Sequence, residues 1–242
     1  MFLRRGLNVA LADVDEAGLV AVRGALGAGP DRLMLHACDV TQSEALRAAA
    51  LEAQERLGDF DVVCLNAGIV GAVGAAEGLG EAAWRRVFDV NLLGPVNGAG
   101  VFMPLLRAQE TGGRLVFTAS VAGMQGVPEI APYAASKAAV VSLAETLWQE
   151  TKGSKIGVSV LCPGYARTAL TASVSAGGGS SAAQEAMLRA IQTGLPPEAV
   201  AQALERGIDA GDLYIFTHED TAPWLRRKIA RIEEALGKVA PL

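Results

Sequence analysis

Tyr133 and Lys137 lie four residues apart in the stretch APYAASK, and Ser120 precedes the tyrosine by thirteen residues. Four residues are about one helical turn, so a helix would place both side chains on one face. A free tyrosine has a pKa of about 10, but an ammonium group within about 4–6 Å favours its phenolate and lowers that pKa. A nearby serine hydroxyl can hydrogen-bond a substrate oxygen. Together these groups could perform the proton transfer that oxidation of an alcohol requires.

Asp13 is a second candidate for chemistry, because it follows the short apolar run that begins at Val9. In dinucleotide-binding folds, an acidic residue at the end of a strand accepts hydrogen bonds from the adenosine ribose. A carboxylate there repels the 2′-phosphate of NADP, and Val14 and Asp15 follow without an arginine to receive that phosphate. Asp13 therefore predicts NAD as the cofactor and disfavours NADP. Capping of the next helix is a compatible alternative for this side chain.

Short apolar runs alternate with longer helical patterns, and these elements must position the candidates. The runs are apolar on both faces, which is typical of a parallel sheet covered by helices on both sides. The alternation predicts an α/β, doubly wound Rossmann-type fold in one domain over residues 1–242. The predicted strands occupy residues 7–12, 32–37, 61–65, 114–118, 155–161 and 212–216, and the predicted helices residues 16–26, 43–57, 81–107, 132–151 and 197–208.

Two segments in the C-terminal part carry separate predictions. Residues 171–184 are small and polar, which fits a loose surface loop or a lid that orders over a ligand. Both interpretations stay open, and the second predicts a substrate lid over residues 169–195. A helix predicted at residues 222–236 has an apolar stripe at helical spacing, and we expect this stripe to pack against the same chain.

Further motifs stand in a fixed order around the tyrosine and the lysine. They are CDVT after the second predicted strand, LNAGI after the third, VFDVNLLG on the next long helix and CPGYARTAL after a later strand. Together with the serine thirteen residues before the tyrosine of a Tyr-x-x-x-Lys pair, they cover almost the whole chain. In these motifs and their order the chain resembles the short-chain dehydrogenase/reductase family.

The resemblance implies an NAD-dependent oxidoreductase that interconverts a secondary alcohol and a ketone. Tyr133 would be the catalytic acid and base, and Lys137 would hold the nicotinamide ribose and lower the tyrosine pKa. Ser120 would bind the substrate oxygen, and Asn91 would position a water that relays protons to the lysine. The implied cofactor contacts are Asp13 at the adenosine ribose, Asp39 and Val40 at the adenine, Asn66, Ala67 and Gly68 along the cofactor, and Tyr133, Lys137, Pro163, Gly164 and Thr168 at the nicotinamide end.

Four of these residues also have ordinary structural interpretations. Asn91 could bond a backbone carbonyl in mid-helix, and Asn66 could shape a turn. Ser120 could cap a loop, and Asp39 could lie at a helix N-terminus. The joint order of the motifs favours the catalytic interpretation.

The family's first strand and its glycine-rich loop have no counterpart in the sequence. No glycines stand at Gly-x-Gly-x-x-Gly spacing, and the run GAVGAAEGLG follows a later strand. In the family that strand lies between those predicted at residues 7–12 and 61–65, so we expect a gap between these two or a distorted sheet. Either Met1 is an internal methionine of a longer protein, or the chain is a non-catalytic binding or regulatory relative without a pyrophosphate site. The serine, tyrosine and lysine favour the first explanation.

The composition argues against a nucleic-acid-binding protein, a membrane-spanning protein and a metalloprotein. The 242 residues carry a net charge of -5 without a basic cluster, which argues against nucleic acid. No long uninterrupted apolar run occurs, which argues against a membrane span. Cys38, Cys64 and Cys162 lie in apolar runs without C-x-x-C spacing, which predicts buried thiols, no metal site and a cytoplasmic protein. His36 and His218 match no motif and are expected to be structural.

Apolar residues around the candidate tyrosine predict a small neutral alcohol or ketone as substrate. Arg167 and Arg189 could bind a carboxylate instead. Family members usually assemble through the long helices that carry Asn91 and Tyr133, so the resemblance implies a homodimer or homotetramer. The expected pocket residues are Ala122, Gly123, Met124, Val127, Ile130 and Tyr165.

Overall fold

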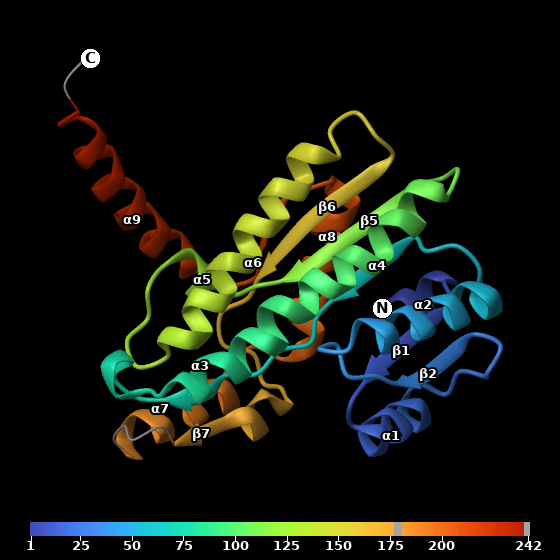
Figure 1. Ribbon diagram of the computed structural model, residues 1–242, viewed down its shortest axis with the longest axis horizontal. Coiled ribbons are helices and arrows are strands. Elements are labelled where there is room, and N and C mark those ends of the chain that lie inside the picture. The colour runs from blue at the N-terminus through green and yellow to red at the C-terminus, as the bar shows by residue number, and fades with distance from the viewer. Residues whose placement is uncertain (177–180, 240–242) are drawn as a thin grey trace.

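The structure is a computed structural model that describes residues 1–176 and 181–239, and parallel strands alternate with helices along it (Figure 1). The six predicted strands and the helices between them are present. The strands are β1 (Val9–Asp13), β2 (Leu33–Ala37), β3 (Val62–Leu65), β4 (Gly71–Val73), β5 (Gly113–Thr118), β6 (Ile156–Cys162), β7 (Val174–Ala176) and β8 (Tyr214–Phe216). The helices are α1 (Glu16–Leu26), α2 (Ser43–Leu57), α3 (Glu81–Phe88), α4 (Gly94–Ala108), α5 (Val121–Met124), α6 (Ala131–Glu150), α7 (Ser181–Gln192), α8 (Pro197–Ala210) and α9 (Thr221–Leu236).

The described strands form separate parallel sheets rather than one. The largest has the order β3-β5-β6-β8, β1 pairs with β2, and the short strands β4 and β7 pair with each other. Within the described residues β1 and β3 do not pair, so the break lies where the sequence predicts a gap. The helices nevertheless cover both faces of the four-stranded sheet, as a doubly wound fold requires.

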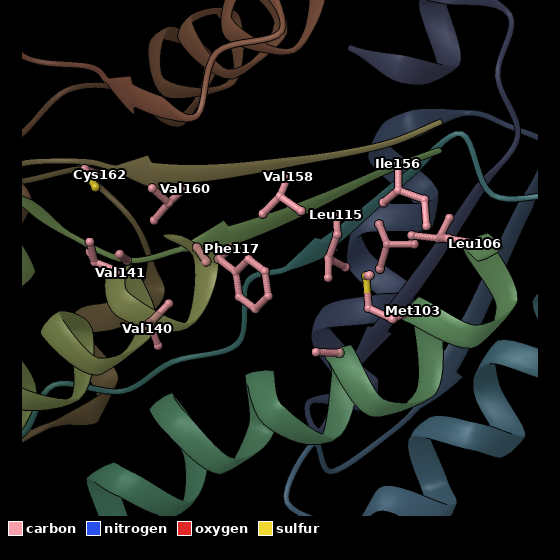
Figure 2. Packing of buried hydrophobic residues seen from close by; sticks show 14 residues of the cluster. Met103, Leu106, Leu115, Phe117, Val140, Val141, Ile156, Val158, Val160 and Cys162 are labelled. Carbon is pink, nitrogen blue, oxygen red and sulfur yellow. The ribbon is translucent and has the colours of Figure 1, made fainter. Parts of the chain in front are cut away.

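Strand β5 shows how the sequence divides the core into two layers. Leu115 and Phe117 point to one face, where they pack with residues of α4 and α6, and neither side chain is exposed (Figure 2). Val116, between them, packs on the other face with residues of α8. Alternate residues of a strand point to opposite faces, so an uninterrupted apolar run is what a sheet covered on both sides needs.

The open edges of β1 and β3 leave part of the sheet exposed. Ala10 and Ala12 of β1 are exposed, although the sequence predicts burial on both faces of this strand. Cys64 of β3 is also exposed, whereas Cys38 and Cys162 are buried. The prediction of a buried thiol is therefore wrong for Cys64, because no described strand lies against the free edge of β3.

The long helix predicted at residues 81–107 is interrupted. Helix α3 ends at Phe88, a π-helical turn spans Asp89–Leu93, and α4 begins at Gly94. The π turn carries Asn91, whose side chain is fully buried. Single π turns inside helices are frequent at functional sites, and the residue periodicity alone does not reveal them.

The segment predicted as a loose loop or a lid is mostly ordered. A 3₁₀ turn covers Ala169–Ser173, β7 follows it and pairs with β4, and α7 begins at Ser181. Residues 177–180 of this stretch lie outside the described residues. Both β4 and β7 are too short to be predicted from an apolar run.

Helix α9 leaves the body of the molecule and projects away from it (Figure 1). Ile229, Ile232 and Leu236 on its apolar stripe are exposed. The prediction that this stripe packs within the chain is therefore wrong, because the helix has no neighbouring element to cover its outer part. No helix in the described part of the chain is both long and apolar enough to cross a bilayer.

Candidate active site

Ser120 lies two residues after the end of β5, at the carboxyl end of the four-stranded sheet. It is the N-cap of α5, and its hydroxyl oxygen accepts a hydrogen bond from the Ala122 amide at 3.1 Å. The same hydroxyl donates to the Pro163 carbonyl oxygen at 3.2 Å. Ser120 is thus both a helix cap and a hydroxyl held at the edge where open α/β sheets bind ligands.

Tyr133 and Lys137 share one face of α6, as their spacing predicts. The Lys137 Nζ lies 5.7 Å from the centroid of the Tyr133 ring. It also donates to the Thr118 carbonyl oxygen at the end of β5, at 2.8 Å. Only 3% of Lys137 is exposed, so its ammonium is held inside the fold by this bond and lies beside the phenol ring.

Burial controls the ionisation of both groups. It raises the pKa of Tyr133, and the side-chain hydrogen bond with Ser120 offsets that rise only in part. Burial also lowers the pKa of Lys137 from 10.5 to about 8. The expected lowering of the tyrosine pKa by the lysine is therefore not observed here, because the desolvation of the phenolate dominates.

Asn91 connects the π turn to the loop after β3. Its Oδ1 accepts a hydrogen bond from the Ile69 amide at 2.8 Å, and its Nδ2 donates to the Ile69 carbonyl oxygen at 2.9 Å. Nδ2 also donates to Ser136 Oγ at 3.1 Å, and that hydroxyl donates to the Tyr133 carbonyl oxygen at 2.7 Å. Asn91 thereby fixes the backbone on both sides of the candidate site, and the bond to Ile69 matches its structural interpretation.

Two glycines allow close approach to Lys137. A Cβ on Gly123 would lie 2.6 Å from the Lys137 carbonyl carbon and oxygen, so α5 packs directly on the backbone of α6. A Cβ on Gly68 would lie 3.2 Å from the Lys137 Nζ. The loop after β3, helix α5 and helix α6 therefore meet at the lysine.

The residues expected along the adenosine end lie after the first three strands. The Asp13 carboxylate accepts a hydrogen bond from the Asp15 amide at 3.0 Å, and both residues are exposed. Asp15, not Asp13, caps α1 by accepting from the Gly18 amide. The capping alternative for Asp13 is therefore wrong, since the helix begins too late to reach its side chain.

Asp39 and Asn66 each make a local hydrogen bond. The Asp39 carboxylate accepts from the Thr41 amide at 2.9 Å, and α2 begins only at Ser43. Asp39 therefore shapes a turn rather than the N-terminus of α2. The Asn66 Oδ1 accepts from the Thr118 hydroxyl at 3.0 Å, which ties the loop after β3 to the end of β5.

The remaining expected cofactor residues are found at the carboxyl ends of their strands. Val40 accepts a hydrogen bond at its carbonyl oxygen from Asn97 Nδ2 at 3.1 Å, and Ala67 is exposed beside Asn66. The Gly164 amide donates to His218 Nδ1 at 3.1 Å, and the other ring nitrogen of His218 bonds the Tyr165 carbonyl oxygen. His218 thus holds the turn after β6, which agrees with its expected structural role, and Thr168 caps the following 3₁₀ turn.

A cavity of about 300 Å³ lies between α7 and the loop that leads into α6. Val127, Ile130 and Tyr165 line it as expected, and Tyr133 packs against the same apolar cluster. Three other expected residues do not line it, since Ala122 is buried in the cluster and Met124 packs on the central core, while Gly123 contacts α6. The remaining lining residues, which the sequence analysis did not identify, are Val73, Pro128, Glu129, Ala183, Ala186, Met187 and Ala190.

Neither candidate arginine lines this cavity. Arg189 is exposed and forms an ion pair with Glu185, four residues earlier on α7. Arg167 is exposed as well. Glu129 is the charged residue of the cavity wall, and its φ of 65° is rare for a residue with a side chain. No pattern in the sequence marks this conformation.

Comparisons with known proteins identify the family of the chain. The short chain dehydrogenase family matches residues 1–178 of the chain. This chain belongs to that family. The 1-deoxy-11-beta-hydroxypentalenate dehydrogenase of Streptomyces exfoliatus is 32% identical over 228 residues, which are 93% of this chain and 79% of the relative. The 3beta-hydroxysteroid dehydrogenase of Mediterraneibacter gnavus is 38% identical over 139 residues, 57% of this chain and 50% of the relative.

A solved structure extends the likeness to the whole chain. The short chain dehydrogenase/reductase from Burkholderia phymatum, solved in complex with NAD, has a TM-score of 0.90 and 31% identity, and the match covers 100% of this chain and 92% of that one. This short-chain dehydrogenase is accordingly an oxidoreductase with the family's α/β fold. The family match begins at residue 1 and so lends no support to the prediction that a first strand and a glycine-rich loop are missing.

Proposed function

We propose that this short-chain dehydrogenase interconverts a secondary alcohol and a ketone, with Ser120, Tyr133, Lys137 and Asn91 as its catalytic set. The observation that supports this most directly is the meeting of the first three side chains. The Ser120 hydroxyl interacts with the Tyr133 phenol, and the Lys137 ammonium lies 5.7 Å from the phenol ring. The names of the dehydrogenase relatives agree with this reaction class.

In the oxidation direction, the Ser120 hydroxyl hydrogen-bonds the substrate oxygen while the Tyr133 phenolate takes the hydroxyl proton. For this step the Lys137 ammonium would have to offset the desolvation that raises the Tyr133 pKa in the structure. Asn91 positions a water that passes protons between the lysine and solvent. A bound nicotinamide supplies the chemistry that the protein lacks, the acceptance of a hydride from the carbinol carbon.

The cofactor we propose is NAD. Asp13 would hold the adenosine ribose, Asp39 and Val40 would lie at the adenine, and Asn66 would lie along the dinucleotide. The exposed Asp13 carboxylate supports NAD over NADP, since a second negative charge at the 2′ position would be repelled. Ala67, Gly68, Pro163, Gly164 and Thr168 complete the proposed cofactor contacts.

The cofactor preference is tested by Asp13→Ser. We expect the ratio of kcat/KM for NAD to that for NADP to fall at least about tenfold, which corresponds to about 1.4 kcal/mol of lost discrimination. Asp15→Asn is the matched control, because it keeps the α1 cap and leaves the ratio unchanged. A native chain that prefers NADP would contradict this proposal.

The catalytic proposal is tested by Tyr133→Phe. With a panel of neutral secondary alcohols and millimolar NAD, turnover measured by NADH absorbance should fall by about 10²–10⁴-fold, as expected for loss of a general acid and base. The cofactor affinity should stay the same. Tyr214→Phe is the control, since the Tyr214 hydroxyl bonds Glu145 away from the site. Retained activity in the Tyr133→Phe variant would remove this residue from the mechanism.

The substrate we propose is a small neutral alcohol or ketone in the cavity beside Tyr165. Residues 169–195 would act as its lid, because α7 supplies part of the cavity wall. We propose assembly into a homodimer or homotetramer through α4 and α6. These finer proposals rest on the catalytic one.

A second candidate function is a non-catalytic binding or regulatory role. The unpaired edges of β1 and β3 favour it, because the pyrophosphate site of the family depends on a strand and a glycine-rich loop between them. Under this alternative, the chain binds neither NAD nor NADP and the panel gives no turnover. Formation of NADH by the native chain would exclude it.

A further inference from the structure

The outer half of α9 is exposed along its whole described length. Thr221 at its start is buried, and Lys228 donates to the Met124 carbonyl oxygen in α5. Every residue from 229 to 239 is exposed, including Ile229 at 52%, Ile232 at 48% and Leu236 at 64%. Helices shorter than about 12–15 residues are marginal alone in water, so this half-helix needs a covering surface.

Four large apolar residues of α9 form a narrow seam, and Trp224 lies beside its start. Leu225, Ile229, Ile232 and Leu236 follow one another at intervals of four, three and four residues. This is the order of successive d, a, d and a positions in a heptad repeat. Such a seam is the contact surface of paired helices rather than the broader face of a helix that lies on a large core.

The charges of α9 indicate the direction of pairing. Arg226, Arg227 and Arg231 lie in its first two thirds, whereas Glu233 and Glu234 lie near its end. A helix dipole favours the opposite distribution, with acidic residues at the start and basic residues at the end. The charges inside α9 therefore oppose its dipole, although Asp220 at the N-cap and Lys238 just past the last turn offset this in part. An antiparallel neighbour with the same sequence would place the acidic end of one helix beside the basic part of the other.

We propose that α9 pairs in antiparallel orientation with α9 of a second copy of this chain. In this register Ile229 packs against the partner's Ile232, and Leu225 against the partner's Leu236. Arg226 and Glu233 occupy equivalent e positions beside the seam, and in antiparallel pairs these positions meet across the interface. Among the described residues, no ion pair uses Arg226 or Glu233 within the chain.

The register brings the partner close to the candidate active site. The partner's Leu236 would lie at Leu225, within one turn of Lys228, which bonds Met124 at the end of α5. Ser120 caps the same short helix. The pairing is distinct from the assembly through α4 and α6 and does not rest on the proposed function.

An anionic membrane is the other surface that α9 could cover, because four basic side chains lie within residues 226–231, a local cluster that the net negative charge of the chain conceals. The two glutamates near the free end of α9 disfavour it, because that end would have to approach the negative surface. A helix that inserts into a bilayer interface also needs a wide apolar face, whereas the apolar seam of α9 is narrow. The observations therefore favour a second copy.

Disulfide cross-linking tests the orientation. In a Cys64→Ser background, which removes the exposed thiol, chains with Leu225→Cys are mixed with chains with Leu236→Cys and oxidised. We expect covalent dimers in the mixture and none from either variant alone, because identical positions lie far apart in an antiparallel pair. The control is a mixture of Leu225→Cys chains with Val20→Cys chains. The proposal would be overturned if Leu236→Cys chains alone formed covalent dimers. It would also be overturned if the test mixture cross-linked no better than the control mixture.

Charge reversal tests the complementarity, with self-association of the 242-residue chain and its variants measured by sedimentation. Arg226→Glu should weaken self-association about tenfold, and adding Glu233→Arg should restore it. Ile229→Glu with Ile232→Glu should halve the mass of the assembly, whereas Val20→Glu, at an equally exposed position of α1, should not. An unchanged mass together with binding to phosphatidylserine vesicles would assign α9 to membranes and refute the pairing.

Discussion

Lys137 illustrates how one residue can oppose folding while serving a site. Its ammonium is almost fully buried and has the Thr118 carbonyl oxygen as its hydrogen-bond acceptor. The folded chain therefore releases the lysine proton near pH 8, whereas the unfolded chain keeps it up to about 10.5. Below pH 8 the whole cost of burying the charge opposes folding. Between pH 8 and 10.5 the unfolded state binds more protons, so this contribution to stability rises with pH.

The Lys137→Met variant tests this effect. Subtracting its free energy of unfolding from that of the native chain isolates the lysine contribution, since the other buried groups remain. Between pH 8 and 10.5 we expect the free energy of unfolding of the native chain to rise relative to that of the variant. The rise is about 1.4 kcal/mol for each pH unit and reaches roughly 3 kcal/mol in total. Urea titrations at pH 7, 8, 9 and 10 measure it. Lys152→Met at an exposed position is the control, and a difference for Lys137 that is flat with pH would contradict the argument.

At the scale of elements, the short helix α5 and the long helix α6 bring the serine to the tyrosine. Ser120 begins α5, and Tyr133 and Lys137 lie on α6. The two helices approach so closely that Gly123 touches the backbone of Lys137. Neither α5 nor α6 alone forms the candidate site. The distance between the two helices decides whether the hydroxyl groups of Ser120 and Tyr133 interact.

The contact between α5 and α6 is tested by Gly123→Ala. The added methyl group would overlap the Lys137 carbonyl, so the helices must separate, and we expect a loss of about 1–3 kcal/mol of stability. Turnover should fall as well, because Ser120 moves with α5. Gly126→Ala is a matched control three residues away, where a Cβ meets open space. Equal melting temperatures for the two variants would show that the contact is not tight.

At the scale of the whole molecule, the separation of β1 from β3 is the dominant feature. Each of these strands presents one edge of backbone groups that no described strand pairs. In parallel α/β folds such edges are normally covered, because the central strands are buried on both sides. The exposure of Cys64 on β3 is a direct consequence.

Calorimetric titration of the 242-residue chain with NAD tests what this separation costs. We expect binding weaker than the micromolar range and a broad thermal transition, because no glycines stand at Gly-x-Gly-x-x-Gly spacing to bring backbone amides close to a pyrophosphate. Titration with adenosine serves as a control for the ribose end at Asp13. Micromolar NAD affinity with a cooperative melt would show that the described elements suffice.

Local patterns in the sequence determine most of the elements. Helices α1 and α2 follow from apolar spacing that ends at Gly27 and Gly58, and β5 and β6 from short, mostly apolar runs. The same patterns place Ser120 after a strand and Tyr133 and Lys137 on one helical face. These features depend on neighbours within about one turn, so the sequence specifies them.

Only the tertiary structure decides the properties that depend on distant residues. The π turn at Asn91 follows from a bond to Ile69 across the fold, and the high pKa of Tyr133 follows from burial by several elements. The exposed edge at Cys64 reflects which strands meet rather than the composition of β3. The apolar seam of α9 is visible in the sequence. The seam stays uncovered because α9 leaves the body of the molecule, as Figure 1 shows. The periodicity of the sequence indicates which face of a helix is apolar, but not which element packs against that face.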